Sequence, residues 1–594
     1  MRGPRNSSGE THPPHPRLTL NVGITGHRAT GLPDGIIALL EPVLAAIFGN
    51  LARSLNHLLE DPATPFASEA PVLRLHTPLA SGADQLAAKS ARKAGFEVRA
   101  LLPFAPSTYR QDFTQGAERA EFERHLGQAG SVFSLPCNAQ DKETGYVMVG
   151  KAVIAVSDVL VAIWDGEKAN GPGGTGHVVE LALKAGVPVI HVDIGRDPTA
   201  IERVALLGTP LGEGIDGDED YDRLARWLLD PLTPDARAEL DQFYAETEKR
   251  ANWRIEYPLM LAMLGIRKIR RSDRWQASID DDIAYEFGEA SIPADPQLSR
   301  TYGWTNFLAI RYAQMFRSGH VLNYALSAIA VLLALAGLLA PDIKLWLVVA
   351  ELVAIALLVL NTRAGNLGQW HRRWLQYRHL AETLRPLSLL KQTGMAPPPF
   401  RRHIRRGETA RREESDWTRW YATAIWRAMA SPEGLVDMSR LEALGQAAIK
   451  EQLAPQASYH RALAHRMHLL DHRLHQVGGT LMGAVIVACG AFICLYLVDQ
   501  DMARNSTGPF IVLTAGLPAV GAAIFGLRGH GEHLLAASRS RATADALEAS
   551  IAGIENADGL ETLSRQIEHA AEVMLADLDE WTMSYRERSL EIPA

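Results

Sequence analysis

A glycine-rich loop is the part of the sequence best suited to chemistry. It reads PGGTGHVVE over residues 172–180 and follows a short apolar run at 159–164. A strand, a glycine loop and a helix start, in this order, present backbone N–H groups and the positive end of a helix dipole to an anion such as phosphate. The loop therefore predicts a site for a nucleotide-like ligand on Gly173, Gly174, Thr175, Gly176 and Glu180.

Polar and small residues follow two other apolar runs as well. The run that starts at Leu18 ends in TGHR, a second leads into SGAD at a helix start, and the run at 159–164 ends in Asp165. One glycine loop is weak evidence because glycine occurs in ordinary turns, but three converging strand ends are more informative. The further ligand-contacting residues that we expect are Gly26, His27, Arg28, Ser81, Gly82, Asp84 and Asp165.

Several of these side chains have a structural alternative. Glu180, one turn inside the predicted helix, would either stabilise a ribosyl centre or hold ribose hydroxyls, or it is a solvated acid that offsets the helix dipole. His27 and Arg28 are either phosphate contacts or a capping cluster. Asp84 is either a ligand contact or an ordinary acid of a first helical turn.

The elements that must position these residues are strands that alternate with amphipathic helices, such as 35–60 and 83–94. This alternation is typical of a parallel α/β sheet, in which ligands lie beyond the carboxyl ends of the strands. The predicted strands are 18–24, 72–76, 98–102, 131–135, 159–164 and 187–192.

Three motifs, GxTGHR, SGADxLA and PGGTGHxxE, together resemble the SLOG superfamily, a Rossmann-like group that includes LOG phosphoribohydrolases and DprA-like proteins. The resemblance covers residues 18–194. It implies that 172–176 hold phosphate, that Ser81 and Gly82 line the nucleotide, and that Glu180 takes the position of the catalytic glutamate. The enzyme pattern has Thr where this chain has His177, and an Arg-rich motif on the preceding helix is not evident. This departure favours binding over glycosidic hydrolysis.

Composition limits the class of protein. A chain of 594 residues predicts several domains, and a net charge of -8 argues against a nucleic-acid binder that acts through bulk positive charge. Only three cysteines occur, which argues against a disulfide framework and fits a reducing compartment. Residues 1–17 contain no apolar run and predict a disordered tail, not a signal peptide.

Four apolar segments are long enough, or nearly so, to cross a bilayer. They form two pairs, each joined by a short loop: 321–340 with 345–360, and 480–498 with 509–527. Arginines gather outside the pairs, and the two short loops carry one lysine and one arginine among acids. The positive-inside rule then predicts a multi-pass protein of the cytoplasmic membrane with both termini in the cytoplasm.

The two pairs resemble a degenerate repeat. Each is followed by Arg-x-x-x-acid-x-Leu, at Arg378 and at Arg541, which places an ion pair beside an apolar stripe. A two-span hairpin followed by such a helix resembles the SLATT group, membrane effector domains that occur alongside SLOG domains in bacterial conflict systems. This resemblance covers residues 299–550.

Two residues within the spans are candidates for a role in a pore. Glu351 is the one acid well inside an apolar segment. It has either a pore-lining or proton-linked role, or it makes an interhelical hydrogen bond or snorkels toward the nearby outer face. Pro518 predicts a kink that serves gating or only geometry. Outside the spans, the basic run 401–413 predicts a linker near anionic lipid, and the His468–His472 pair favours an amphipathic helix over a metal site.

The predicted fold is an α/β Rossmann-like parallel sheet domain followed by an all-α membrane domain with four transmembrane helices. The predicted domains are a tail (1–17), a SLOG-like nucleotide-binding domain (18–200), a helical connector (201–310), a first hairpin with its cytoplasmic helix (311–390), a basic and helical linker (391–455), and a second hairpin with cytoplasmic helices (456–594).

The leading functional hypothesis is a membrane-anchored sensor and effector in bacterial antiphage defence. A nucleotide or a nucleotide-derived second messenger would be its ligand, with no further cofactor, no metal and no nucleic-acid partner, and a pore would require a homo-oligomer in the bilayer. The alternatives are a membrane-tethered nucleotide phosphoribohydrolase that uses Glu180, and a non-enzymatic membrane scaffold.

Overall fold

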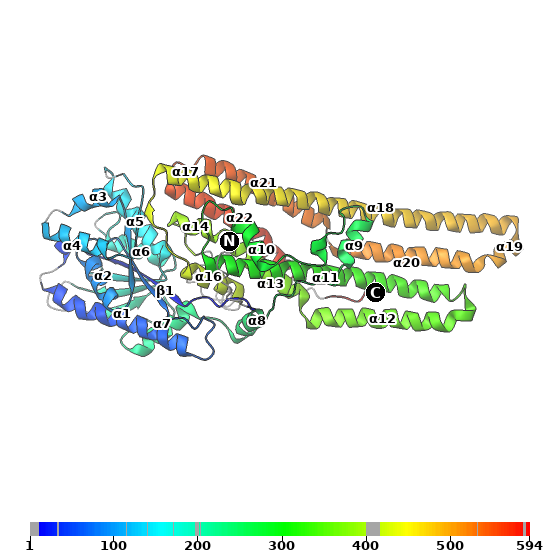
Figure 1. Ribbon diagram of the computed structural model, residues 1–594, viewed down its shortest axis with the longest axis horizontal. Helices are drawn as coiled ribbons and strands as arrows, with labels where there is room; N and C mark the ends of the chain where they lie inside the picture. Colours follow the sequence, from blue (N-terminus) through cyan, green and yellow to red (C-terminus); the bar gives the residue numbers. More distant parts are fainter. Residues whose placement is uncertain are drawn as a thin grey trace, which may run out of the picture.

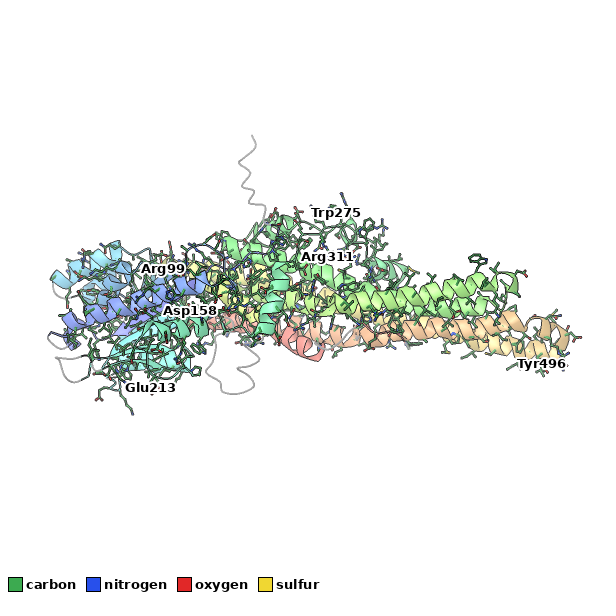
Figure 2. The ribbon with its side chains drawn as sticks, turned by 90° about the horizontal axis from the view of Figure 1, so that it is seen from below. Arg99, Asp158, Glu213, Trp275, Arg311 and Tyr496 are labelled. Carbon is green, nitrogen blue, oxygen red and sulfur yellow. The ribbon has the colours of Figure 1, made fainter. Side chains whose placement is uncertain are left out.

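The computed structural model describes residues 11–32, 35–113, 116–138, 140–169, 171–195, 201, 203–398, 416–531, 533–585 and 590–593. The molecule is elongated, with an α/β domain at one end and long helices that extend from the other (Figure 1). Tyr496 marks the far tip of these helices, and Asp158 lies on the α/β side (Figure 2). The predicted fold class is confirmed.

The α/β domain is built on an eight-stranded sheet in the order β7-β6-β5-β1-β2-β3-β4-β8. All neighbours pair in parallel except β6 and β7. The strands are β1 (Thr19–Gly26), β2 (Val72–Thr77), β3 (Glu97–Leu102), β4 (Ser131–Ser134), β5 (Val159–Trp164), β6 (Val189–Asp193), β7 (Arg203–Leu207) and β8 (Gly434–Leu435). The six predicted strands are confirmed within about two residues at each end, whereas β7 and β8 were not predicted.

Helices cover both faces of this sheet. They are α1 (Ile36–Glu60), α2 (Ala83–Lys93), α3 (Pro106–Tyr109), α4 (Gly116–Gly127), α5 (Lys142–Val156), α6 (Thr175–Lys184) and α7 (Asp218–Leu229). The longest, α1, buries Leu40, Leu44 and Phe48 completely, because residues four apart lie on one face of a helix. That stripe packs into the main core of the molecule.

The remaining helices form a body beside the sheet and the long projection. They are α8 (Pro234–Tyr244), α9 (Glu256–Met263), α10 (Ile279–Phe287), α11 (Pro296–Ala336), α12 (Lys344–Leu367), α13 (Trp370–Leu384), α14 (Leu387–Thr393), α16 (Trp417–Ala428), α17 (Met438–Ala447), α18 (Ala454–Val498), α19 (Gln500–Asn505), α20 (Thr507–Gly531), α21 (His533–Glu555) and α22 (Leu560–Tyr585). Short turns of other helix types lie at Ala29–Gly31, Arg110–Asp112, Arg271–Asp273, Pro341–Ile343 and Ala448–Leu453.

Five helical segments among the described residues are long and apolar enough to cross a membrane. Four of them coincide with the predicted spans, on α11, α12, α18 and α20, although α11 ends at Ala336, four residues before the predicted end of the first span. The fifth is α1, which packs on the sheet. Helix α11 pairs with α12 and α18 pairs with α20, and the two hairpins meet through α11 and α20 (Figure 1). The projection is therefore one bundle of two hairpins.

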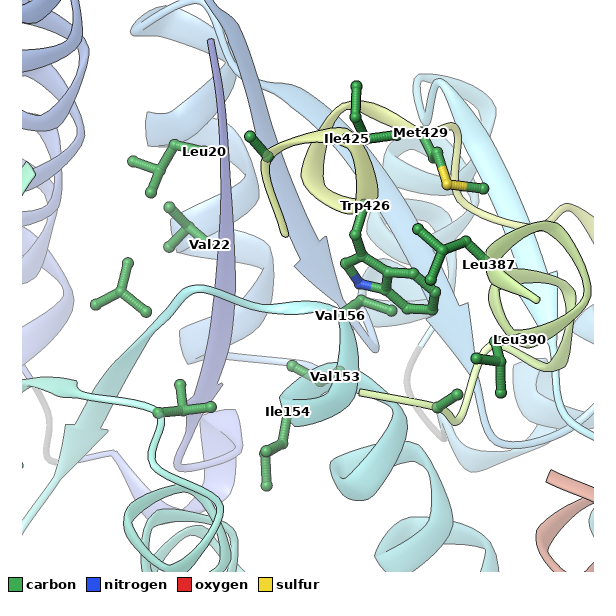
Figure 3. Close-up of a cluster of buried hydrophobic side chains, with 14 of the residues drawn as sticks. Leu20, Val22, Val153, Ile154, Val156, Leu387, Leu390, Ile425, Trp426 and Met429 are labelled. Atoms are coloured by element: carbon green, nitrogen blue, oxygen red, sulfur yellow. The ribbon is translucent and has the colours of Figure 1, made fainter. Parts of the chain in front are cut away.

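An apolar interface joins the sheet domain to the helical body. The indole of Trp426, on α16, is buried and lies between Val156 of α5 and Leu387 of α14 (Figure 3). Strand β8 comes from the same region of the chain and extends the sheet beside β4. Part of the predicted linker 391–455 thus belongs to the core of the sheet domain, although its basic run 401–413 lies outside the described residues.

Polar contacts reinforce this interface at the amino ends of the strands. The Arg427 Nε donates to the Asp158 Oδ1 over 2.6 Å, and both side chains are nearly buried. Arg74 of β2 donates to the carbonyl oxygens of residues 427, 428 and 429 at 2.9 to 3.1 Å. These carbonyls end α16 and have no partner within the helix, so the guanidinium of Arg74 caps it.

The end of the predicted tail also packs on the molecule. Pro13 and Pro16 are buried, and Tyr421 donates a hydrogen bond to the carbonyl of Pro14. The ring of His15 stacks on Tyr244 with 3.7 Å between ring centroids. Residues 11–17 therefore lie between the sheet domain and the helical body.

Candidate functional site

A cavity of about 770 Å³ lies at the carboxyl ends of β1 and β5. From β1 the chain proceeds to β2 on one side of the sheet, while β5 leads to β6 on the other. Such a reversal leaves a crevice at the strand ends, which is where ligands bind in open α/β sheets. The cavity is lined by nine of the predicted residues: Gly26, His27, Arg28, Asp84, Asp165, Gly173, Gly174, Thr175 and Gly176.

Ser81 and Gly82 do not line the cavity but hold one of its walls. The backbone N–H of Ala29 donates to the carbonyl of Ser81 over 3.1 Å. Gly82 has a φ of +94°, and a Cβ there would lie 2.5 Å from the backbone nitrogen of Ala29. Only glycine fits, because both the left-handed backbone and the close approach exclude a side chain. These two residues fix the start of α2 against the loop after β1.

The glycine loop closes on itself through His177. The backbone N–H of Gly173 donates to the Nδ1 of His177 over 3.0 Å, so this amide is already occupied. A Cβ on Gly176 would lie 2.8 Å from the carbonyl oxygen of Glu167. Helix α6 has no side-chain cap at Gly174, and the N–H groups of a first helical turn have no partner within the helix. Those first-turn groups of α6 are the ones suited to an anion.

Arg28 brings a positive charge to the cavity wall. Its guanidinium carbon lies 4.9 Å from the ring centroid of Tyr146 on α5, and the Tyr146 hydroxyl donates to Asp112 over 2.5 Å. Burial acts to lower the pKa of Arg28, but Tyr109, Tyr146 and Asp112 outweigh it, so the pKa is raised. Arg28 therefore stays charged in a partly desolvated setting, where a phosphate contact is strong.

Asp84 brings a carboxyl group to the same cavity. Its side chain is buried and accepts a hydrogen bond from the backbone N–H of Ala80 over 3.2 Å. Burial raises the pKa of Asp84 to about 7, against the opposing effects of the Ala80 hydrogen bond and the charge of Arg28. A carboxyl group that titrates near neutral pH is suited to proton transfer or to a pH-dependent contact.

His27 and Asp165 lie across the strand ends from each other. The Nε2 of His27 is 3.4 Å from the Oδ1 of Asp165, which is an ion-pair distance, but the two groups are not aligned as a hydrogen bond. The pair links the end of β1 to the end of β5 beside the glycine loop.

Glu180 lies outside the cavity lining. Its side chain is 61% exposed, and its Oε1 is 2.7 Å from the ammonium of Lys184 one turn along α6. The hydrogen bond from Lys184 lowers the pKa of Glu180. The carboxylate is thus an ionised, solvated group on the outer face of α6.

Two cavity residues, Tyr109 and Tyr146, were missed by the sequence reasoning. Neither belongs to a strand end, since they come from α3 and from the middle of α5. Lys151, also on α5, pairs with Glu561 of α22 over 2.7 Å and does not line the cavity. The signal for Tyr146 would have been its place on the α5 face shared with Val149 and Val153.

The predicted membrane residues occupy the two hairpins. Glu351 is half-buried on α12, and α20 continues through Pro518 from Thr507 to Gly531. Among the residues that the structure describes, no group of three or more His, Cys, Asp or Glu side chains is arranged to hold a metal ion.

Comparison with protein-family models, with curated proteins and with solved structures gives no match to this chain.

Proposed function

We propose that the chain is a membrane-anchored sensor whose sheet domain binds a nucleotide-derived phosphate ligand. The observation that carries this proposal is the cavity of about 770 Å³, which combines the first turn of α6, the guanidinium of Arg28 and the ring of Tyr146. The amides and the guanidinium suit a phosphate, and the ring suits a base or sugar face. The motif resemblance to the SLOG superfamily supports the same ligand class.

The four long apolar helices form the proposed effector. They would cross the cytoplasmic membrane of a bacterium, with both termini in the cytoplasm, because arginines flank the hairpins on that side. Two hairpins enclose little space, so a change in permeability requires several copies of the chain. The resemblance to the SLATT group extends this proposal to antiphage defence through damage to the host membrane.

The ligand must favour one arrangement of the spans for such a device to work. Helix α5 lines the cavity through Tyr146 and also contacts α22 through the Lys151–Glu561 ion pair. Both side chains of that pair are about 40% exposed, so it adds only about 0 to 1 kcal/mol. The position of the pair matters more than its energy. A shift of α5 on ligand binding would move Lys151, and with it the contact that α5 makes with Glu561 of α22.

The test is nucleotide-dependent ion flux through liposomes that contain the full-length protein. Ligands from a nucleotide panel are first chosen by thermal shift of the same protein. Arg28→Gln should weaken binding by about 10- to 100-fold and abolish flux at ligand concentrations that open the wild type. Arg110→Gln removes an equal charge from an exposed ion pair with Glu123 and should change neither. Confirmed binding without flux would contradict the effector half of the proposal, and absence of binding would contradict the sensor half.

Hydrolysis of the N-glycosidic bond of the bound nucleotide is the second candidate function. The specific observation in its favour is the buried Asp84, whose pKa of about 7 suits a general acid or base in the cavity. This reaction would release a free base and a ribose phosphate, which chromatography of the incubation mixture would detect. Loss of that product in Asp84→Asn, and not in Glu180→Gln, would identify the carboxyl group that acts.

A further inference from the structure

A second cavity, of about 400 Å³, lies between the two hairpins. Its walls come from α9, α11, α13, α18, α21 and α22, so both hairpins contribute to it. Arg317 on α11 lines it and lies four residues before the apolar segment that starts at residue 321. At Arg317 the cavity is therefore about one helical turn from the start of the first span, on the side of the sheet domain. On α18 it is lined by residues 456–467, which end 13 residues before the apolar segment that starts at residue 480.

This hairpin cavity is lined by more positive than negative groups. Four arginines and two acids line it, an excess of two positive charges with histidine neutral: Arg267, Arg317, Arg378, Arg539, Asp273 and Glu382. Arg267 makes a two-point contact with Asp273 at 2.7 and 2.8 Å, and Arg378 is paired with the buried Glu382. Both acids are thereby already engaged.

Arg317 differs from these paired arginines. Within the described part of the chain it has no acid within ion-pair distance. Its guanidinium carbon lies 4.8 Å from the ring centroid of Trp374 and 5.5 Å from that of Tyr257. Stacking on aromatic rings orients the planar group and leaves its N–H groups for another acceptor, an arrangement that suits a phosphate.

The surroundings of the hairpin cavity are those of a membrane boundary. Leu261 of α9 packs against Leu470 and Leu474 of α18, so α9 is wedged at the base of the second hairpin. Met263, the last residue of α9, is exposed, and so is the indole of Trp275 further along the chain (Figure 2). Exposed tryptophan between basic residues is typical of the headgroup level of a bilayer.

We propose that the hairpin cavity binds the phosphate group of a phosphate ester, with the guanidinium of Arg317 as its main contact. Two sources share this chemistry: the headgroup of an anionic phospholipid and a soluble phosphate ester. Because the walls belong to both hairpins, the ligand bridges them and stabilises one packing of α11 against α18. The proposal deepens the effector half of the proposed function, and it does not require nucleotide binding by the sheet domain.

The test is native mass spectrometry of delipidated full-length protein in a neutral detergent. Three probes are added separately: phosphatidylglycerol, glycerol 3-phosphate and phosphatidylcholine. We expect one retained phosphate ester per chain, and about tenfold weaker retention in Arg317→Gln, since a charge-assisted contact is lost. Retention of phosphatidylglycerol alone identifies a lipid headgroup as the ligand, and retention of glycerol 3-phosphate identifies a soluble ester. Arg317→Lys keeps the positive charge but loses the planar set of N–H donors. Its retention of the probe should lie between that of the wild type and that of Arg317→Gln.

The matched control is Lys268→Gln, which removes an exposed positive charge nearby that does not line the cavity. It should retain the probe as the wild type does. Equal retention by wild type and Arg317→Gln, or no retention of any probe by the wild type, would overturn the proposal. Arg317→Gln should keep the nucleotide thermal shift of the sheet domain, and this readout separates failure here from failure of the proposed function.

Discussion

At the scale of single residues, the site in the sheet domain depends on Arg28 and Asp84, which bring opposite charges to one cavity. Arg28 remains a cation because the surrounding tyrosines and Asp112 offset its burial. Asp84 changes charge near neutral pH because burial disfavours its ionised form. Arg28 would therefore attract an anionic ligand at all physiological pH values. Asp84 would repel the ligand only above about pH 7, where its carboxyl group is ionised.

Asp84→Asn tests this pH dependence. Since the pKa of Asp84 is raised from 3.8 to about 7, the carboxyl group is neutral below that value and carries a negative charge above it. Ligand affinity of the wild type should fall by about tenfold between about pH 6 and pH 8. The free energy of unfolding should fall between about pH 4 and pH 7, because in that range the folded state holds the proton and the unfolded state does not. Calorimetric titration of Asp84→Asn with the same ligand should show a smaller fall, because phosphate titration alone remains. Identical profiles would contradict the placement of Asp84 beside the ligand.

Glu180→Gln tests the exposed glutamate of α6. The substitution removes only a solvated contact with Lys184, so ligand affinity should change by less than about twofold and the melting temperature should stay close to that of the wild type. Thermal shift with a bound nucleotide is the measurement. A large loss of affinity would show that α6 rotates to bring this carboxylate to the ligand.

At the scale of elements, the glycine loop ahead of α6 is shaped by close approach. Gly176→Ala would place a Cβ 2.8 Å from the carbonyl oxygen of Glu167 and 3.0 Å from the nitrogen of Ala169, so the loop must move. We expect a loss of ligand binding of at least about tenfold by thermal shift, with a loss of about 1 to 3 kcal/mol in stability. Gly49→Ala, in the middle of α1 with open space around it, should instead stabilise the protein by about 0.5 to 1 kcal/mol. Equal effects of the two substitutions would contradict this account of the loop.

The C-terminal segment 590–593 is a second element with a defined place. Leu590 is buried, and it exchanges two backbone hydrogen bonds with the side chain of Asn366 at 2.9 and 3.1 Å. It fills the space beside Gly319 and Gly365, where side chains would meet it. The segment therefore closes the base of the first hairpin between α11 and α12.

Leu590→Ala tests this contact. It should destabilise the detergent-solubilised protein by about 2 to 5 kcal/mol, because it leaves a cavity between two helices. Differential scanning fluorimetry is the measurement. Ile592→Ala, two residues away and 54% exposed, is the control and should shift the melting temperature little. An equal shift for both variants would mean that the segment is not anchored through Leu590.

At the scale of the whole molecule, the carboxyl ends and the amino ends of the strands have separate roles. The carboxyl ends of β1 and β5 form the ligand cavity, while the amino end of β2 and the turn before β5 hold α16 through Arg74 and Asp158. This division places the ligand on one side of a rigid sheet and the helices that lead to the spans on the other. Helix α5 connects the two sides, because it lines the cavity through Tyr146 and pairs with α22 through Lys151 and Glu561.

Arg427→Ala tests the interface at this junction. It leaves the buried carboxylate of Asp158 without its charge partner, which costs about 3 to 5 kcal/mol. We expect a lower melting temperature and faster proteolysis between the sheet domain and the helices. Arg419→Ala on the same helix removes an equal charge from the more exposed pair with Asp416, at 32% and 29% exposure, and should have a smaller effect. If the two variants unfold alike, the sheet domain is not held through this ion pair.

Much of the sheet and the spans follows from local patterns in the sequence. Apolar runs of four to eight residues bounded by turns identified six of the eight strands, because a buried parallel strand excludes polar residues on both faces. Longer apolar runs, of about 16 to 20 residues, located the four long apolar helices. Strand β8 has only two residues and was not predicted, because its pairing with β4 is decided by a segment some 300 residues away in the chain.

The sequence by itself determined where the candidate ligand site lies, since the carboxyl ends of parallel strands lie together on one side of the sheet. It also placed Gly26, Arg28 and Gly176 at that site. Only the tertiary structure decided which neighbouring residues reach the cavity. Rotation about a helix axis turned Glu180 to solvent and Tyr146 inward, and burial changed the pKa of Asp84. Spacing along the chain fixes the position of a residue on a helix, whereas the packing of that helix fixes the side chain's surroundings and thus its chemistry.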